Sequence, residues 1–280
     1  MNKSILITGC SSGIGRHVAT GLQQRGYRVF ATARKDEDVI MLNEAGLTAL
    51  QLDLTDPMSI SNCVKKVLNE TDGTLDALFN NGAYGLPGAV EDLTRDALRD
   101  QFETNVFGWI ELTNRVLPVM RRQGYGRIIQ NSSVLGFAAM PYRGAYNSSK
   151  FAIEGISDTL RQELYGTGIH VSIIEPGPIL SRFRANALDA FYKYIDMENS
   201  AHKEQYDNML ARLNKEGKAA PFTLGPEAVL SKVVHALEAP KPKIRYYVTF
   251  PTWLFAWLRH LLSYRQMDKV LRAAGGGGKR

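Results

Sequence analysis

Strand-length apolar runs alternate with helix-length amphipathic stretches along most of this chain. Asp56 and Pro57, for example, supply an N-cap and a first-turn proline for one of the intervening helices. Strict alternation favours right-handed βαβ units. We therefore expect an α/β fold built on a single doubly wound parallel sheet of about seven strands, with helices on both faces. The predicted strands are residues 4–8, 28–33, 47–53, 75–81, 126–133, 170–176 and 244–250.

The domain organisation follows from the lack of a composition break or an internal repeat in the 280 residues. Residues 1–250 are expected to form one domain. An insertion at about 180–222, rich in aromatic and long polar side chains, separates the sixth strand from the next helix. Residues 251–274 are predicted to form a helical extension, and residues 275–280 a disordered tail.

Composition narrows the class of function. Cys10 and Cys63 are too few for a disulfide framework or a zinc site, and the five histidines show no metal-ligand spacing, so we expect no metal. The net charge of +6 is concentrated near the C-terminus, which argues against nucleic-acid binding by the main domain. With no signal peptide or membrane-spanning run evident in the sequence, we expect a cytoplasmic location.

A glycine-rich turn, TGCSSGIG, occupies residues 8–15 between the first strand and the first helix. Gly9, Gly13 and Gly15 permit a tight turn and a close approach of the backbone to a pyrophosphate at the helix N-terminus. Taken alone this is a weak signal, because a flexible turn has a similar composition. Its position at the first βα connection favours dinucleotide binding.

Five motifs in order make a family resemblance definite. The glycine turn is followed by NNGAYG (80–85), Asn105, Ser133, YNSSK (146–150) and PGPILS (176–181). This order and spacing resemble the short-chain dehydrogenase/reductase family to about residue 250, and within it the NADP-dependent reductases related to retinol and hydroxysteroid dehydrogenases. The resemblance implies a Rossmann-type fold and reversible reduction of a carbonyl compound to an alcohol. One departure is Gly82-Ala83 where the family has Ala-Gly, which would cause strain if Ala83 needed a positive φ.

The end of the second strand predicts the cofactor. Arg34 and Lys35 stand where an acidic residue would bind the ribose of NAD, so the sequence favours NADP(H). A solvated loop arginine beside Asp36 is the alternative. By resemblance, the cofactor contacts also include Gly9, Ser11, Ser12, Gly13, Ile14, Gly15, Asp53, Leu54, Asn81, Gly82, Tyr146, Lys150, Pro176, Gly177, Ile179 and Ser181.

Tyr146 and Lys150 would share one face of a helix, since they are four residues apart. A nearby ammonium group lowers the pKa of a tyrosine from its usual value of about 10, which suits a proton donor in carbonyl reduction. By resemblance, Ser133 orients the substrate oxygen, Lys150 also holds the cofactor ribose, and Asn105 holds a water that relays protons. Each residue alone has an ordinary structural interpretation.

The sequence says less about the substrate and the partners than about the cofactor. The expected substrate contacts are Ser133, Leu135, Tyr142, Tyr146 and Phe183, which suggest an apolar pocket suited to aldehydes, ketones, retinoids or steroids. Residues 253–272 are open to three interpretations: a peripheral membrane contact, an oligomer contact or a helix packed on the core. The resemblance implies a homodimer or homotetramer. The alternative function is a non-catalytic NADP-binding redox sensor or scaffold, which the retained Tyr146, Lys150 and Ser133 disfavour.

Overall fold

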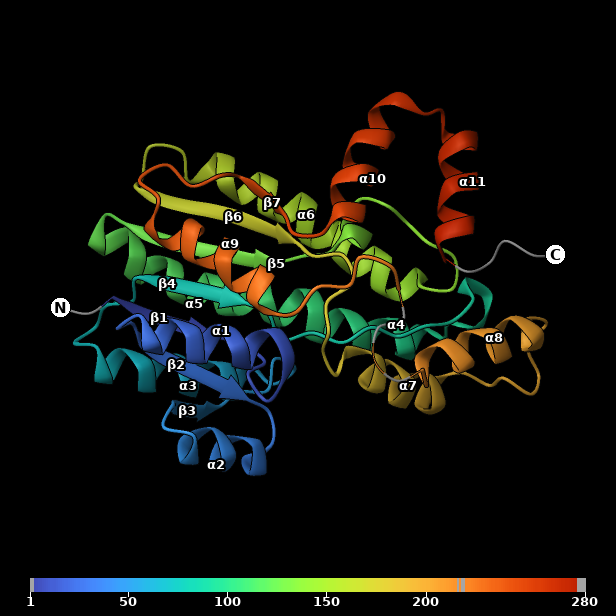
Figure 1. The fold of residues 1–280 in the computed structure, drawn as a ribbon. Helices are drawn as coiled ribbons and strands as arrows, with labels where there is room; N and C mark the ends of the chain where they lie inside the picture. The colour runs from blue at the N-terminus through green and yellow to red at the C-terminus, as the bar shows by residue number, and fades with distance from the viewer. Residues whose placement is uncertain (1–2, 216, 218–219, 276–280) are drawn as a thin grey trace.

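The computed structural model describes residues 3–215, 217 and 220–275. Seven strands form one parallel sheet in the order β3-β2-β1-β4-β5-β6-β7 (Figure 1). This confirms the predicted fold class. The strands are β1 (Ser4–Ile7), β2 (Arg28–Ala33), β3 (Thr48–Gln51), β4 (Ala77–Asn80), β5 (Gly126–Asn131), β6 (Ile169–Glu175) and β7 (Arg245–Tyr247).

Helices cover both faces of the sheet because successive strand residues point to opposite sides. In β1, Leu6 belongs to a core with Ile60, beneath α3 (Pro57–Glu70), α5 (Gly108–Gln123) and α6 (Gly144–Glu163). Its neighbour Ile5 belongs to a second core with Val18 and Val229, beneath α1 (Gly13–Gln24), α2 (Asp36–Glu44) and α9 (Glu227–Glu238). The predicted Asp56 cap is confirmed, since its carboxylate accepts a 2.8 Å hydrogen bond from the Met58 amide.

The helical stretch between β4 and β5 is interrupted. The connection begins with the short helix η1 (Val90–Asp92), and α4 (Arg95–Phe102) then runs into a π-helical turn, η2 (Glu103–Phe107), before α5 starts. Such turns are rare and are frequent at functional sites. This one contains Asn105, which is fully buried. A short helix, η3 (Val134–Gly136), follows β5 and Ser133.

The insertion and the C-terminal extension are both helical. The insertion holds α7 (Phe183–Tyr194) and α8 (Lys203–Leu213), and the extension holds α10 (Phe250–Leu261) and α11 (Tyr264–Gly275) as a projecting hairpin (Figure 1). The last strand is shorter than predicted because Thr249 is the N-cap residue of α10 and Pro251 enters its first turn. Within the described ranges, no helix is long and apolar enough to cross a membrane.

One prediction for the C-terminus needs correction. Gly275, expected to open a disordered tail, is the last residue of α11. Arg212 donates a 3.1 Å hydrogen bond to its carbonyl, which ties the end of the helix to the body of the molecule. The rest of the predicted tail, residues 276–280, lies outside the described residues.

Candidate active site

The glycine turn after β1 is so tight that a side chain is excluded at each of its three glycines. Gly9 has a φ of +71° and Gly13 a φ of +56°, in the left-handed region that glycine tolerates. A Cβ added to Gly15 would lie 2.2 Å from the carbonyl oxygen of Gly9. The turn therefore leads the backbone directly into the N-terminus of α1, where amide groups suit an anion.

The loop after β4 holds this turn in place. The Thr8 hydroxyl accepts 2.8 Å hydrogen bonds from the amides of Asn81 and Gly82, and the Asn81 side chain donates to the carbonyls of Thr8 and Gly9. Neither Gly82 nor Ala83 has a positive φ, so the strain considered for this pair is absent. Thr8 was not predicted, although a threonine directly before the first loop glycine is a visible signal.

The segment after β6 folds over the glycine turn. The carbonyl of Pro176 accepts a 2.8 Å hydrogen bond from the Val134 amide, which joins the ends of β5 and β6. A Cβ on Gly13 would approach the Cβ of Ser181 to 2.9 Å. The predicted cofactor positions in these two segments thus lie side by side, although they are far apart in the sequence.

Three predicted catalytic residues meet at the carboxyl end of β5. Lys150 on α6 is 1% exposed, and its Nζ donates a 2.7 Å hydrogen bond to the carbonyl of Asn131. The same Nζ lies 5.7 Å from the ring centroid of Tyr146 and 4.3 Å from that of Trp109. Ser133 directly follows the strand, and its hydroxyl accepts from the amide of Leu135 at 3.1 Å.

Burial dominates the electrostatics of this group. It lowers the pKa of Lys150 to about 7, against the opposing effect of Glu154. It also raises the pKa of Tyr146, while the neighbouring Ser133 hydroxyl acts in the opposite direction. The expectation of a lowered pKa for Tyr146 is therefore wrong, because burial raises this pKa and the opposing contribution comes from the Ser133 hydroxyl and not from Lys150.

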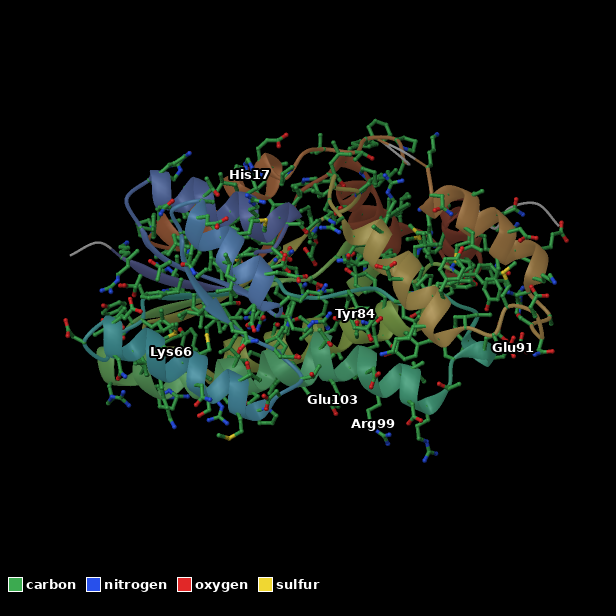
Figure 2. The ribbon with its side chains drawn as sticks, turned by 90° about the horizontal axis from the view of Figure 1, so that it is seen from below. His17, Lys66, Tyr84, Glu91, Arg99 and Glu103 are labelled. Carbon is green, nitrogen blue, oxygen red and sulfur yellow. The ribbon has the colours of Figure 1, made fainter. Side chains whose placement is uncertain are left out.

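Asn105 fixes the loop in front of Tyr146. Its Oδ1 accepts from the Tyr84 amide at 3.1 Å, and its Nδ2 donates to the Tyr84 carbonyl at 2.8 Å and to the Ser149 hydroxyl at 3.1 Å. Tyr84, which Figure 2 shows near the middle of the view, is half-buried, whereas Lys66 and Arg99 are exposed. The position of Asn105 links the π-helical turn to α6, and its role in a water relay stays a prediction.

Trp109 is a site residue that the sequence reasoning missed. Its side chain is fully buried. The indole Nε1 donates a 2.8 Å hydrogen bond to the Gly82 carbonyl, and the ring covers the ammonium group of Lys150. Its spacing of four residues from Asn105 was the available signal, since the two share a helical face.

The end of the sheet expected to hold the adenosine is more open. Arg34 and Lys35 are both exposed, and Lys35 pairs with Glu37 at 3.0 Å. The Asp53 carboxylate accepts from the amide and the hydroxyl of Thr55 at 2.9 and 2.8 Å, so it closes a turn. The predicted contacts of Arg34 and Asp53 with the cofactor therefore stay predictions.

The predicted substrate contacts fall into two groups. Phe183, the first residue of α7, lies edge-on to Tyr146 with ring centroids 5.2 Å apart. Tyr142 instead packs against His202 and Tyr206, with centroids 5.5 and 6.3 Å apart. Leu135 packs against a cluster that includes residues of α10 and α11. Only Phe183 is thus brought directly to the proposed proton donor by these ring contacts.

A partly buried charge cluster that includes Glu154, one helical turn after Lys150, was also not predicted. Arg245 of β7 forms ion pairs with Glu154, with Asp158 at 2.6 Å and with Glu175 at 3.0 Å. Burial and the neighbouring Glu154 raise the pKa of Glu175 to about 8. An arginine inside the apolar strand run was the signal for this cluster. In the described part of the chain, no group of three potential ligands is arranged to hold a metal.

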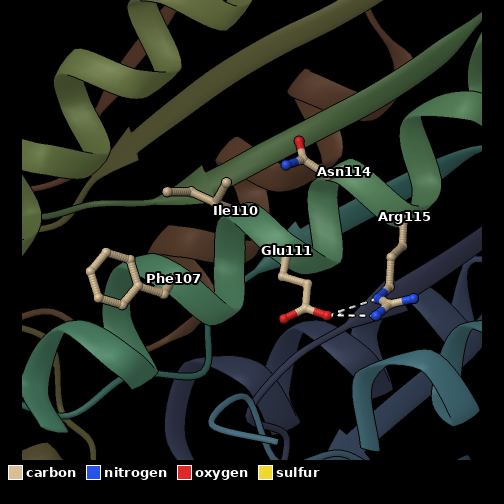
Figure 3. Close-up of a pocket in the computed structure, with 5 residues that line it drawn as sticks. All are labelled: Phe107, Ile110, Glu111, Asn114 and Arg115. Carbon is tan, nitrogen blue, oxygen red and sulfur yellow. Dashed lines mark hydrogen bonds and ion pairs between the residues drawn. The ribbon is translucent and has the colours of Figure 1, made fainter. Parts of the chain in front are cut away.

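A hollow of about 350 Å³ lies elsewhere, on the outer side of α5. Figure 3 shows its lining, with Glu111 and Arg115 joined by an ion pair of 2.6 Å. The lining also includes Phe107, Ile110 and Asn114, and it contains none of the predicted catalytic or cofactor residues. This hollow is therefore separate from the candidate active site.

Comparisons with known proteins agree with this geometry. The family model described as short chain dehydrogenase matches residues 3–190. The uncharacterized oxidoreductase YbbO of Escherichia coli is 44% identical over 97% of this chain and 95% of its own. The human 17-beta-hydroxysteroid dehydrogenase type 1 is 34% identical over 88% of this chain and 77% of its own. The NADPH-dependent 3-dehydrocapnine reductase of Ornithobacterium rhinotracheale is 32% identical over 95% and 94%, respectively.

Solved structures show the same architecture. A short-chain dehydrogenase from Streptomyces avermitilis covers 100% of both chains with a TM-score of 0.76 and 28% identity. An actinorhodin polyketide ketoreductase variant with NADPH covers 88% of this chain and 95% of its own, with a TM-score of 0.72 and 28% identity. A Burkholderia phymatum enzyme in complex with NAD covers 93% of both chains, with a TM-score of 0.79 and 22% identity. The chain is therefore an oxidoreductase that belongs to the short-chain dehydrogenase family.

Proposed function

We propose that this protein is an NADPH-dependent reductase that converts an apolar aldehyde or ketone to an alcohol. The observation that carries the proposal is the grouping of Tyr146, Lys150 and Ser133 at the carboxyl end of β5, beside the glycine turn that opens α1. In open α/β sheets, this end of the strands is where ligands bind.

The residues present fit a dinucleotide. The three glycines of the turn have no room for a Cβ, and Ser181 lies against Gly13. Gly9, Ser12 and Gly13 would hold the pyrophosphate, while Lys150 and Ser181 would hold the nicotinamide end. When bound, the cofactor supplies the hydride that the carbonyl carbon accepts.

Side chains of the protein supply the proton that the substrate oxygen accepts. The Ser133 hydroxyl hydrogen-bonds the substrate oxygen and orients it toward Tyr146, whose hydroxyl donates its proton to that oxygen. A raised pKa keeps Tyr146 protonated at neutral pH, which is the form that reduction requires. Phe183, edge-on to Tyr146, covers the site and excludes water.

The choice of NADPH is supported by charge at the end of β2. Arg34 and Lys35 are exposed there, and a guanidinium can bind a 2′-phosphate through two parallel hydrogen bonds. An NADPH-dependent relative and a solved relative with NADPH are consistent with this choice. An apolar ketone is supported by the hydroxysteroid named for the human relative and by the Phe183 ring.

We also propose a cytoplasmic homo-oligomer. The exposed Phe107 and the hollow on α5 offer an apolar surface to a second copy. Cys10 and Cys63 are buried free thiols, as is usual in a reducing compartment.

The test is NADPH oxidation measured against a panel of aldehydes and ketones. Tyr146→Phe should lower kcat by roughly 10²–10⁴-fold with little change in NADPH affinity, because only the proton donor is lost. Tyr165→Phe is the control, since Tyr165 is 92% exposed. Full activity in Tyr146→Phe would refute the catalytic assignment. NADPH binding without turnover on any carbonyl would favour a redox sensor or scaffold instead.

A further inference from the structure

Helix α10 has two faces of different character. Thr252, Phe255 and Ala256 are buried against the body of the protein. The opposite side carries five exposed apolar side chains, separated by three or four residues so that they share one face. This α10 patch consists of Phe250 (57% exposed), Trp253 (59%), Leu254 (36%), Trp257 (63%) and Leu261 (59%).

The patch packs on the rest of the protein only at its edge, where the Trp253 ring contacts Tyr247 with centroids 5.0 Å apart. The inner face of the α10–α11 hairpin already packs Phe255, Met267 and Leu271 against Val134 and Ala138. A further aromatic ring extends the patch, because Phe222 is 60% exposed and its ring centroid is 5.0 Å from that of Phe250. Contiguous apolar surfaces of this kind mark interaction sites, whereas scattered exposed residues do not.

The same hairpin is basic. Residues 250–275 contain four Lys or Arg and one acid, Asp268. Arg265, Lys269 and Arg272 are exposed and spaced along one face of α11. In the ranges that the structure describes, none of them forms an ion pair. Exposed tryptophans and cations in one helical hairpin are typical of segments that lie in a membrane interface.

We propose that the α10–α11 hairpin docks on the surface of an anionic lipid bilayer, with the α10 patch among the acyl chains near the headgroups. The positive charge of the hairpin favours this partner over a second copy of the chain. Two basic hairpins would repel each other, whereas anionic lipids would attract a basic hairpin. Helix α10 has only 12 residues, so it lies on the bilayer and does not span it.

Docking would bring the active site close to the bilayer. The inner face of the hairpin packs on the segment that follows Ser133, including Val134, Leu135 and Met140. Apolar carbonyl compounds concentrate in lipid, so the enzyme would meet them where they are most abundant. The docking itself needs no turnover, and its test is therefore independent of the proposed reaction.

Tryptophan fluorescence gives a direct readout. The chain has three tryptophans, and Trp109 is fully buried, so a change in emission on adding vesicles reports Trp253 and Trp257. We expect a blue shift with phosphatidylcholine vesicles that contain phosphatidylglycerol, a much smaller shift with phosphatidylcholine alone, and reversal by salt. No shift with either vesicle would overturn the proposal.

Paired variants separate the apolar and the electrostatic contributions in vesicle co-sedimentation. Leu261→Ser with Trp257→Ser should lower the bound fraction at least about tenfold, because two large side chains no longer leave water. Tyr165→Ser, which alters an exposed aromatic ring outside the patch, should not. Arg265→Gln with Lys269→Gln should lower binding to the anionic vesicles roughly tenfold.

Two exposed lysines of α3 supply the matched charge control. Lys65→Gln with Lys66→Gln should leave binding unchanged; Figure 2 shows Lys66 at the surface of α3. The reduction of a water-soluble aldehyde should be the same in all these variants. If vesicles do not bind and the Trp257 variant instead dissociates an oligomer in light scattering, the patch is a protein interface and the proposal is wrong.

Discussion

Replacing Lys150 by methionine should change how stability depends on pH. Lys150 is 1% exposed, and burial lowers its pKa from 10.5 to about 7. Between these two values, the unfolded chain holds a proton on the amine that the folded chain does not. The free energy of unfolding of the wild type therefore rises with pH across this window, because the cost of burying an ammonium ion disappears.

The size of the effect follows from the two pKa values. Each unit of difference corresponds to about 1.4 kcal/mol. With a folded pKa of about 7, the free energy of unfolding of the wild type should rise by roughly 2–3 kcal/mol relative to that of Lys150→Met between about pH 6 and about pH 9. Methionine has a similar length and no charge, so the loss of the hydrogen bond to Asn131 adds an offset that pH does not change.

The assay is urea denaturation of both proteins, without cofactor, at several pH values in this range. Groups that titrate in both proteins, such as Glu175, cancel in the difference. Parallel stability profiles for the wild type and Lys150→Met would refute the reasoning, because they would mean that Lys150 keeps an ordinary pKa in the fold. A wild type that becomes less stable relative to Lys150→Met as the pH rises would also refute it, because the sign would be reversed.

Four other changes test separate parts of the structure. Gly15→Ala places a Cβ 2.2 Å from a loop carbonyl and should weaken NADPH binding at least about tenfold in a titration, while Gly155→Ala, with open space around it, should not. Arg34→Ala should raise the KM for NADPH roughly tenfold or more and leave that for NADH unchanged in steady-state kinetics. Trp109→Phe should cost about 1–2 kcal/mol in urea denaturation, because it removes a 2.8 Å hydrogen bond to a loop carbonyl. In cofactor-free protein, the phenolate absorbance of wild type minus Tyr146→Phe should show no titration below pH of about 10.

The sheet was predictable because local patterns decide it. All seven strands lie within about three residues of their expected bounds, and the largest difference is at the C-terminal end of β7. The Asp56 cap and the interruption around Asn105 were also visible, since a cap and a helix break depend on neighbouring residues. The glycine turn was predictable for the same reason, because Gly9, Gly13 and Gly15 stand where its conformation excludes a side chain.

What the sequence could not supply depends on distant contacts and on burial. The pKa direction of Tyr146 was wrong because a neighbouring cation is visible in the spacing, while the loss of hydration is not. Trp109 and Thr8 act through bonds to Gly82, a residue on another segment. The contact of Tyr142 with α8 required knowledge of how the insertion folds back on the body.

The charged groups that surround Lys150 extend beyond the YNSSK motif (146–150). Tyr146, Lys150, Glu154 and Asp158 follow one another at intervals of four residues, so they form a column on one face of α6. Glu154 favours the charged form of Lys150, and Arg245 of β7 pairs with both carboxylates of the column. Removing Arg245 would take the ion-pair partner from Glu154 and Glu175, whose side chains are 10% and 1% exposed, whereas Asp158 would keep its ion pair with Arg161. The surroundings of Lys150 thus include β7, a strand that contributes no motif residue, because Arg245 pairs with the Glu154 carboxylate that favours the charged form of Lys150.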